Sequence, residues 1–247
     1  MEVMSAKLYS NQDITGWLLS EKLDGVRAIW DGEKLLTKTG KKIHVPDWFI
    51  KGFPQGVILD GELTMGRGTF QETVGIVRSH SGDWSRVWYS VFDMVGEQPF
   101  KKRYDTLRYM VLPSVIEIEP QFYFCNEEEF KMVEEEFLED GAEGMMVRDP
   151  DAPYVHKRTD CILKVKRFIT EECKVTSYTE GTGRNKGRVG ALWSTYNNLP
   201  FKIGTGLSDE DRDNPPPVGS IITFKYFELT NRGVPRFPSF IGVRDYE

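Results

Sequence analysis

The sequence has few of the residues that build disulfide frameworks or metal centres. Its three cysteines, Cys125, Cys161 and Cys173, form no CxxC pair, and its three histidines lie far apart with no metal-ligand spacing. Disulfide-rich domains and structural zinc sites need such residues in closely spaced sets. We therefore exclude both, and we expect free thiols, mostly buried, in a reducing compartment.

A long apolar stretch is also missing. The N-terminal segment carries Lys7, Asp13 and a polar run at 10–12, whereas a signal peptide needs a continuous apolar core and a membrane helix needs about 20 apolar residues. With 247 residues, 39% of them hydrophobic, the chain can bury a sizeable core. The sequence therefore predicts a cytoplasmic globular protein with no signal peptide and no membrane contact.

Positive charges are fewer than negative ones, which argues at first sight against a nucleic-acid partner. The net charge is −6 and the pI is near 5.3. The acids are concentrated at 127–140, however, whereas basic residues gather at 38–42, 156–167 and 184–188. Each basic run alone is compatible with a solvated surface. Three runs beside candidate catalytic segments instead indicate a face that contacts phosphate.

Hydrophobic periodicity predicts that the first two thirds of the chain mix strands with helices. Phe130, Val133, Phe137 and Leu138 share one helical face with acids on the other side, so the acidic run is explained as the wet face of a helix. The pattern predicts strands at 25–30, 56–63, 87–95, 144–148 and 161–168, and helices at 69–77, 103–109 and 126–140.

After Phe168 the pattern changes to short strands without long helices. Ser208 and Asp211 have the spacing of a capping box for one short helix, which Pro215 ends. About five strands in such a short segment predict a small closed barrel of the oligonucleotide-binding (OB) kind. We therefore expect two domains, 1–169 and 170–247, with the second built from strands at 173–178, 191–196, 201–203, 221–227 and 240–244.

Charged residues near strand ends form the candidate site. Lys22 precedes a predicted strand, with Asp24 two positions on and Arg27 five positions on. A KxDG match alone is weakly specific and equally fits a charged turn. Asp60 and Glu62 project from the same face of one predicted strand. Such a carboxylate pair suits a divalent metal or a sugar hydroxyl, although it also fits a solvated strand end.

A second group of charges follows later in the chain. Glu143 precedes an apolar strand, and Lys164 and Lys166 alternate with Leu163 and Val165, so the two lysines share a face. Two neighbouring ammonium groups repel each other unless an anion lies between them. A triphosphate is the obvious candidate.

The order and spacing of these segments resemble the covalent nucleotidyltransferases, namely DNA ligases, RNA ligases and mRNA capping enzymes. The likeness is greatest to the minimal ATP-dependent DNA ligases of bacteria and their viruses, and it extends to the ending 235–245, which resembles their closing barrel motif. The resemblance implies an α+β fold: an ATP-grasp-like adenylyltransferase domain, with antiparallel sheets flanked by helices, then a five-stranded OB-fold barrel. It also implies sealing of nicks in double-stranded DNA by a monomer.

The resemblance assigns the catalytic roles to the first group of charges. It makes Lys22 the nucleophile that attacks the α-phosphorus of ATP, with Asp24 in the same catalytic motif. Lys164 and Lys166 are expected to hold the α-phosphate, and the crowding of cations around Lys22 is expected to favour loss of its proton.

Nucleotide and metal contacts are also implied by the resemblance. Glu62 and Glu143 are expected to bind Mg²⁺ or Mn²⁺, and Glu62 also the ribose side. Ser20 and Glu21 flank the adenine. Phe92 resembles the aromatic that stacks on the base, although an aromatic in an apolar strand is more often core.

Other cations are expected to contact the nucleotide or DNA. Arg27 and Lys38 stand where the family contacts ribose and the 5′-phosphate of the nick; a lysine replaces the usual arginine at 38, so a point charge replaces a planar fork. Arg244 and Asp245 begin the motif that orients the leaving pyrophosphate.

The glycine-rich loop 181–188 lacks the GxxxxGK[ST] spacing of a phosphate-binding loop and lies between predicted barrel strands. A flexible hairpin loop is the simplest explanation. Its cations Arg184, Lys186 and Arg188 also suit nonspecific contact with the DNA backbone, which requires charge and no base reading.

Two alternatives remain open at this point. An RNA ligase or RNA guanylyltransferase would share the lysine chemistry, and a catalytically silent oligonucleotide-binding protein would use Lys22 only as a surface cation. An NAD-dependent ligase is disfavoured, because only 21 residues precede Lys22 and that family needs an additional N-terminal domain.

Overall fold

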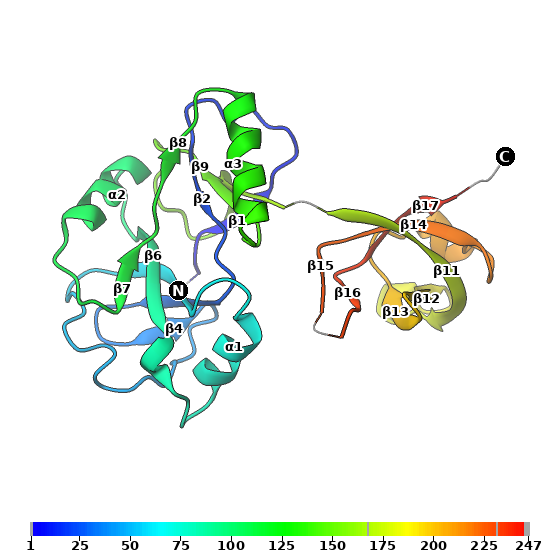
Figure 1. Cartoon of the computed structure of the whole chain (residues 1–247), viewed down its shortest axis with the longest axis horizontal. Helices are drawn as coiled ribbons and strands as arrows, with labels where there is room; N and C mark the ends of the chain where they lie inside the picture. Colours follow the sequence, from blue (N-terminus) through cyan, green and yellow to red (C-terminus); the bar gives the residue numbers. More distant parts are fainter. Residues whose placement is uncertain (1, 167, 231, 245–247) are drawn as a thin grey trace. The chain divides into compact units, whose positions relative to one another are not determined.

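Two five-stranded sheets build the first of two compact units, Met1–Lys166 and Arg167–Glu247 (Figure 1). The computed structural model describes residues 2–166, 168–230 and 232–244. The strands of the first unit are β1 (Ser5–Leu8), β2 (Leu18–Glu21), β3 (Val26–Trp30), β4 (Leu35–Thr37), β5 (Leu59–Thr64), β6 (Trp88–Met94), β7 (Ile116–Ile118), β8 (Phe122–Tyr123), β9 (Met145–Arg148) and β10 (Arg158–Val165); its helices are α1 (Phe70–Arg78), η1 (Trp84–Arg86), α2 (Phe100–Tyr109) and α3 (Glu127–Glu139).

The first sheet, here sheet A, has the order β1-β10-β9-β2-β8, with β1 and β10 parallel and the other pairs antiparallel. Side chains alternate between its faces because a strand has a period of two. Leu19, Val147 and Leu163 are fully buried on one face, where they belong to the same core as Phe130 of α3. The opposite face carries the even-numbered residues of β2, β9 and β10.

The second sheet, sheet B, has the order β4-β3-β5-β6-β7, in which only β6 and β7 are parallel. Its apolar face packs Leu59, Leu63 and Tyr89 into the largest core, together with Val77 of α1 and Leu107 of α2. Its other face is polar.

The second unit contains β11 (Ile169–Glu180), η2 (Gly183–Asn185), β12 (Val189–Tyr196), β13 (Leu199–Ile203), α4 (Asp209–Asp213), β14 (Ile221–Tyr226), β15 (Glu228–Leu229), β16 (Pro235–Arg236) and β17 (Ser239–Val243). Five of these strands form one antiparallel sheet in the order β13-β12-β11-β14-β17, around a core that includes Leu192, Ile222 and Phe224. The predicted capping box is confirmed, since Ser208 and Asp211 bond reciprocally at the start of α4.

The expectation of a closed barrel needs correction. The edge strands β13 and β17 share no ladder among the described residues and meet only through one parallel bridge, Thr205 to Ser239, in which the N–H of Phe240 donates to the Thr205 carbonyl at 2.9 Å. The chain turns directly after this bridge, at Gly206, which has a φ of +85°. A Cβ there would lie 2.3 Å from the Phe240 carbonyl oxygen, so only glycine permits the turn.

The longer predicted elements are confirmed, with ends shifted by a few residues. The two sheets are mixed rather than wholly antiparallel, because each contains one parallel pair. Among the described residues, no helix has the length and apolar character needed to cross a membrane.

Candidate active site

Sheets A and B together line one cavity of about 320 Å³ within the first unit. The regular cross-strand register of sheet A aligns Ser20 of β2, Met146 of β9 and Lys164 of β10 in one row. The lining comprises Ser5, Ala6, Ser20, Glu21, Lys22, Leu23, Met146, Arg148, Arg158, Ile162 and Lys164 from the sheet A side, and Arg27, Lys38, Glu62 and Phe92 from the sheet B side.

Glu143 connects two of the lysines predicted to carry the chemistry. Its carboxylate contacts the Nζ of Lys22 through one oxygen and the Nζ of Lys166 through the other. The backbone N–H of Lys22 donates to the Gly144 carbonyl at 2.9 Å, which extends the β2–β9 pairing and places Lys22 beside Glu143. Residues separated by more than 100 positions are thus brought into one ion-pair cluster.

Lys164 adds a third ammonium group to this cluster. Burial lowers the pKa of Lys164, and the nearby cations Lys166 and Arg158 lower it further. Such crowding of cations is relieved when an anion binds among them. The arrangement therefore suits a phosphate group, as the alternation of Lys164 and Lys166 with buried Leu163 and Val165 predicted.

On sheet B, Arg27 is fixed by a buried carboxylate. Its Nε and Nη2 donate to the two oxygens of Asp60 at 2.9 and 2.6 Å, and Nη2 also donates to the Met4 carbonyl at 2.6 Å. The Tyr154 hydroxyl donates to the same carboxylate at 2.6 Å. Two parallel N–H···O bonds hold the guanidinium in a defined plane at the cavity wall.

The glycine of the KxDG segment is explained by close packing. A Cβ on Gly25 would lie 2.3 Å from the Leu63 carbonyl oxygen and 3.0 Å from Cγ of Glu62.

We expect Gly25→Ala to lower the free energy of unfolding by about 1–3 kcal/mol, because the loop after Lys22 must move away from β5. Chemical denaturation measures this. The matched control is Gly75→Ala within α1, where a Cβ meets nothing within 4 Å and alanine should stabilise the helix by about 1 kcal/mol. Equal stability of Gly25→Ala and wild type would contradict the packing argument.

The fold changes the acidity of Glu62 at this cavity. Burial raises the pKa of Glu62 to about 8, although the charges of Lys22 and Arg27 oppose the rise. The folded chain therefore holds this proton more tightly than the unfolded chain, in which the carboxyl titrates near 4.5. The resulting stabilisation is complete below pH 4.5 and is lost as the pH rises through 8.

We therefore expect the free energy of unfolding of the wild type to fall between pH 4.5 and 8 more steeply than that of Glu62→Gln. Denaturant titrations across this pH range compare the two slopes. Identical slopes would show that Glu62 does not hold its proton in the folded protein.

The acidic residues at this site provide only part of the ligand set that a divalent cation needs. Among the residues that the structure describes, no group of three or more His, Cys, Asp or Glu side chains is arranged so that it could hold a metal ion by itself. Glu62 and Glu143 are close enough for the charge of one to raise the pKa of the other. Magnesium is commonly held by one or two carboxylates together with substrate phosphates, and a cation would compensate the half-buried Glu62 carboxylate. The pair therefore suits a metal that arrives with a phosphate ligand.

The remaining predicted residues are spread more widely. Asp24 is half-buried and does not line the cavity. In the second unit, Arg244 pairs with Glu172, whereas Asp245 lies outside the described residues. Arg184 and Lys186 are exposed in the loop 181–188, but Arg188 pairs with Asp209 at 3.3 Å and Asp213 at 2.8 Å. These carboxylates compete with any phosphate for Arg188.

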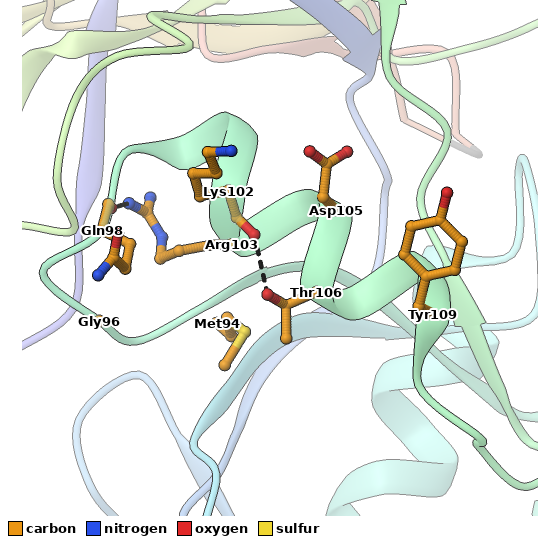
Figure 2. Close-up of a pocket in the computed structure, with 8 residues that line it drawn as sticks. All are labelled: Met94, Gly96, Gln98, Lys102, Arg103, Asp105, Thr106 and Tyr109. Carbon is orange, nitrogen blue, oxygen red and sulfur yellow. Dashed lines mark hydrogen bonds between the residues drawn. The ribbon is translucent and has the colours of Figure 1, made fainter.

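Sequence reasoning missed several residues of the cavity wall. Arg148 was assigned only to a strand, and Arg158 only to a basic run. Ser5 lies on β1, which reaches the site through parallel pairing with β10. A second cavity of about 460 Å³ lies beside α2 and is lined by none of the predicted site residues (Figure 2).

Comparison with known proteins agrees with this geometry. Residues 5–166 match the model of the ATP dependent DNA ligase domain, and residues 180–244 match that of the DNA ligase OB-like domain. A curated DNA ligase from Haemophilus influenzae is 39% identical over 244 residues, which cover 97% of this chain and 91% of that protein. The chain belongs to the ATP-dependent DNA ligase family. It is therefore an enzyme, which excludes the silent binding protein, and the RNA-directed alternatives are not favoured.

Solved structures of ligases support the same assignment. A Lig E DNA ligase superposes with a TM-score of 0.93 at 36% identity and covers 99% of both chains. The DNA ligase-adenylate of Chlorella virus is 27% identical with a TM-score of 0.59, covering 100% of this chain and 99% of that one. The OB assignment of the second unit thus holds even though its sheet is not a closed barrel.

Proposed function

We propose that this ligase joins a 5′-phosphate to the adjacent 3′-hydroxyl at a nick in duplex DNA, acting as a monomer in the cytoplasm of a bacterium or phage-infected cell. ATP supplies the adenylyl group and Mg²⁺ is the metal. The observation that carries the proposal is the contact of Glu143 with both Lys22 and Lys166, because Lys22, together with Lys164, lines a cavity large enough for a nucleotide.

In the first step, Nζ of Lys22 attacks the α-phosphorus of ATP, the bond to the bridging oxygen breaks, and pyrophosphate leaves. The ammonium must first lose a proton, and the Glu143 carboxylate is the group in contact with it. Lys164 and Lys166 supply positive charge beside the reacting phosphate, where negative charge accumulates. Arg244 is proposed to orient the leaving pyrophosphate, and Asp24 and Asp245 belong to the same machinery.

The nucleotide itself is proposed to lie between the two sheets. Phe92 stacks on the adenine, with Ser20 and Glu21 at its edge, while Arg27 and Glu62 contact the ribose side. Arg67 donates to both oxygens of Glu21 at 3.0 and 2.8 Å and so fixes this carboxylate at the cavity wall.

A divalent cation, when bound by Glu62 and Glu143, would neutralise phosphate charge during the transfer. The later steps use the same residues. The adenylyl group passes from Lys22 to the 5′-phosphate of the nick, which Lys38 and Arg27 are proposed to contact, and the 3′-hydroxyl then displaces AMP.

The loop 181–188 is proposed to contact the DNA backbone through Arg184 and Lys186. Replacing both by alanine should weaken nick binding at every sequence and reduce the slope of log K against log salt by about 2, since each phosphate contact contributes about 0.9. Titrations of labelled nicked duplex at several salt concentrations measure the slope. Lys131→Ala removes an exposed lysine of α3 and serves as control. A double variant with an unchanged slope would exclude the loop from the interface.

The function is tested by gel-resolved sealing of three labelled substrates with ATP and Mg²⁺: a nicked DNA duplex, the same nick with RNA at both ends, and unpaired DNA strands. We expect full-length product mainly from the DNA nick. Preferential sealing of the RNA nick would overturn the proposed substrate and restore the RNA ligase alternative.

A further inference from the structure

The side chain proposed to stack on adenine lies on an irregularity of sheet B. In the pairing of β5 with β6, Asp60 is opposite Asp93 and Gly61 is opposite Val91, so Phe92 is the additional residue of a β-bulge. Regular alternation would point Asp93 into the core beside Val91. Bulges re-aim side chains and are frequent next to active sites. Here the bulge places Asp93 on the same side as Asp60.

The bulge places two carboxylates opposite each other, where they would repel without compensating cations. Both are completely buried. Asp60 is paired with Arg27, whereas Asp93 accepts from two guanidiniums. Arg103 of α2 donates from Nε and Nη2 at 2.8 and 3.0 Å, and Arg148 of β9 donates from Nη1. A buried carboxylate with such partners is costly to change, because removing one charge leaves the others uncompensated.

The ion pair between Asp93 and Arg148 crosses from sheet B to sheet A beside Phe92. Arg148 belongs to sheet A and lines the nucleotide cavity. Its guanidinium lies 5.8 Å from the centroid of the Phe92 ring, and that of Arg27 lies 5.4 Å from the same centroid. Phe92 therefore lies within cation–π distance of two guanidiniums, each bound to a buried carboxylate.

Arg103, the second guanidinium that binds Asp93, is held in place by further hydrogen bonds. Arg103 also donates to the carbonyls of Gln98 and Ala152, and Figure 2 shows its side chain directed to the Gln98 loop. Arg148 packs on the Phe100 ring at 4.4 Å from its centroid. Asp93 thus joins α2, β6 and β9 through groups that have little freedom to move.

We infer that Asp93 is a positioning residue for nucleotide binding, which acts through Arg148 to fix the Phe92 ring and the spacing of the two sheets at the base end of the cavity. The inference rests on the proposed function, since it requires Phe92 to stack on the base. It predicts that the effect of changing Asp93 on ATP affinity disappears when the ring is absent.

The test is a double-mutant cycle on ATP binding, measured by calorimetry in the Lys22→Ala protein so that ATP is not consumed. Phe92→Ala should weaken binding by about tenfold, in line with a stacking contribution of about 1–3 kcal/mol. Asp93→Asn should weaken it about fivefold or more. The protein with both changes should bind no more than about twofold more weakly than Phe92→Ala alone. Asp160→Asn, which alters an exposed aspartate paired with Lys7, should leave affinity unchanged.

A merely structural role for Asp93 would give a different result. The effect of Asp93→Asn on ATP affinity would then add to that of Phe92→Ala in full, and this result would overturn the inference. Arg148→Lys repeats the cycle if Asp93→Asn is poorly folded, because lysine keeps the charge but loses the planar contact with the ring. If the Lys22→Ala protein carrying Phe92 and Asp93 binds no ATP, the proposed function itself fails.

Discussion

Replacing Lys22 by alanine is expected to abolish the covalent enzyme–AMP adduct, with a loss on the order of 10⁴-fold or more in the rate of its formation. No other lysine can take its place, because Lys164 and Lys166 emerge from β10 or just beyond it and are proposed to hold the phosphate under attack. Radiolabel transfer from ATP to the protein measures the rate.

The same variant separates the steps of the reaction. Lys22 is proposed to act as nucleophile only in the first step, so Lys22→Ala should still seal a nick that already carries AMP on its 5′-phosphate, at a reduced rate. The control is Lys7→Ala, which removes an exposed lysine paired with Asp160 at 3.0 Å. Adduct formation by Lys22→Ala at near the wild-type rate would exclude Lys22 as nucleophile.

Changing Glu143 to glutamine is expected to slow adduct formation by on the order of 100-fold or more. The substitution keeps the shape of the side chain but removes the charge that compensates both Lys22 and Lys166. The two ammonium groups would then repel each other, and Lys22 would no longer be held beside β9. The proposed metal site would also lose one of its two carboxylates. Single-turnover rates at saturating ATP measure the effect.

The matched control is Glu139→Gln, which removes one charge from the exposed end of α3, only four positions away in sequence. It should retain the wild-type rate, and both variants should unfold at similar temperatures. A wild-type rate for Glu143→Gln would mean that its contacts with the two lysines are incidental to the chemistry.

Local patterns were sufficient to predict much of the fold and most of the lysine cluster. Leu163 and Val165 alternate with Lys164 and Lys166, and this alternation alone determines which side chains share a face. The helix at 126–140 was equally clear, because its apolar and acidic residues separate at a helical period. The order and spacing of the charged segments then identified the family.

Features that depend on long-range register could not be predicted in this way. Arg148 reaches Asp93 only because β6 and β9, in different sheets, face each other across the cavity. Strand β1 is short and becomes part of the site only through pairing with β10, about 150 residues later. The close approach of Gly206 to the Phe240 carbonyl in the second unit likewise joins distant segments, and no local pattern reveals it.

The most direct test of the account is peptide mapping by mass spectrometry after incubation of the intact protein with ATP and Mg²⁺, followed by a chase with nicked DNA. The account predicts AMP attached to the peptide containing Lys22 and its loss when the DNA is added, as sealed product appears. AMP on a different residue, or an adduct at Lys22 that nicked DNA does not discharge, would contradict it.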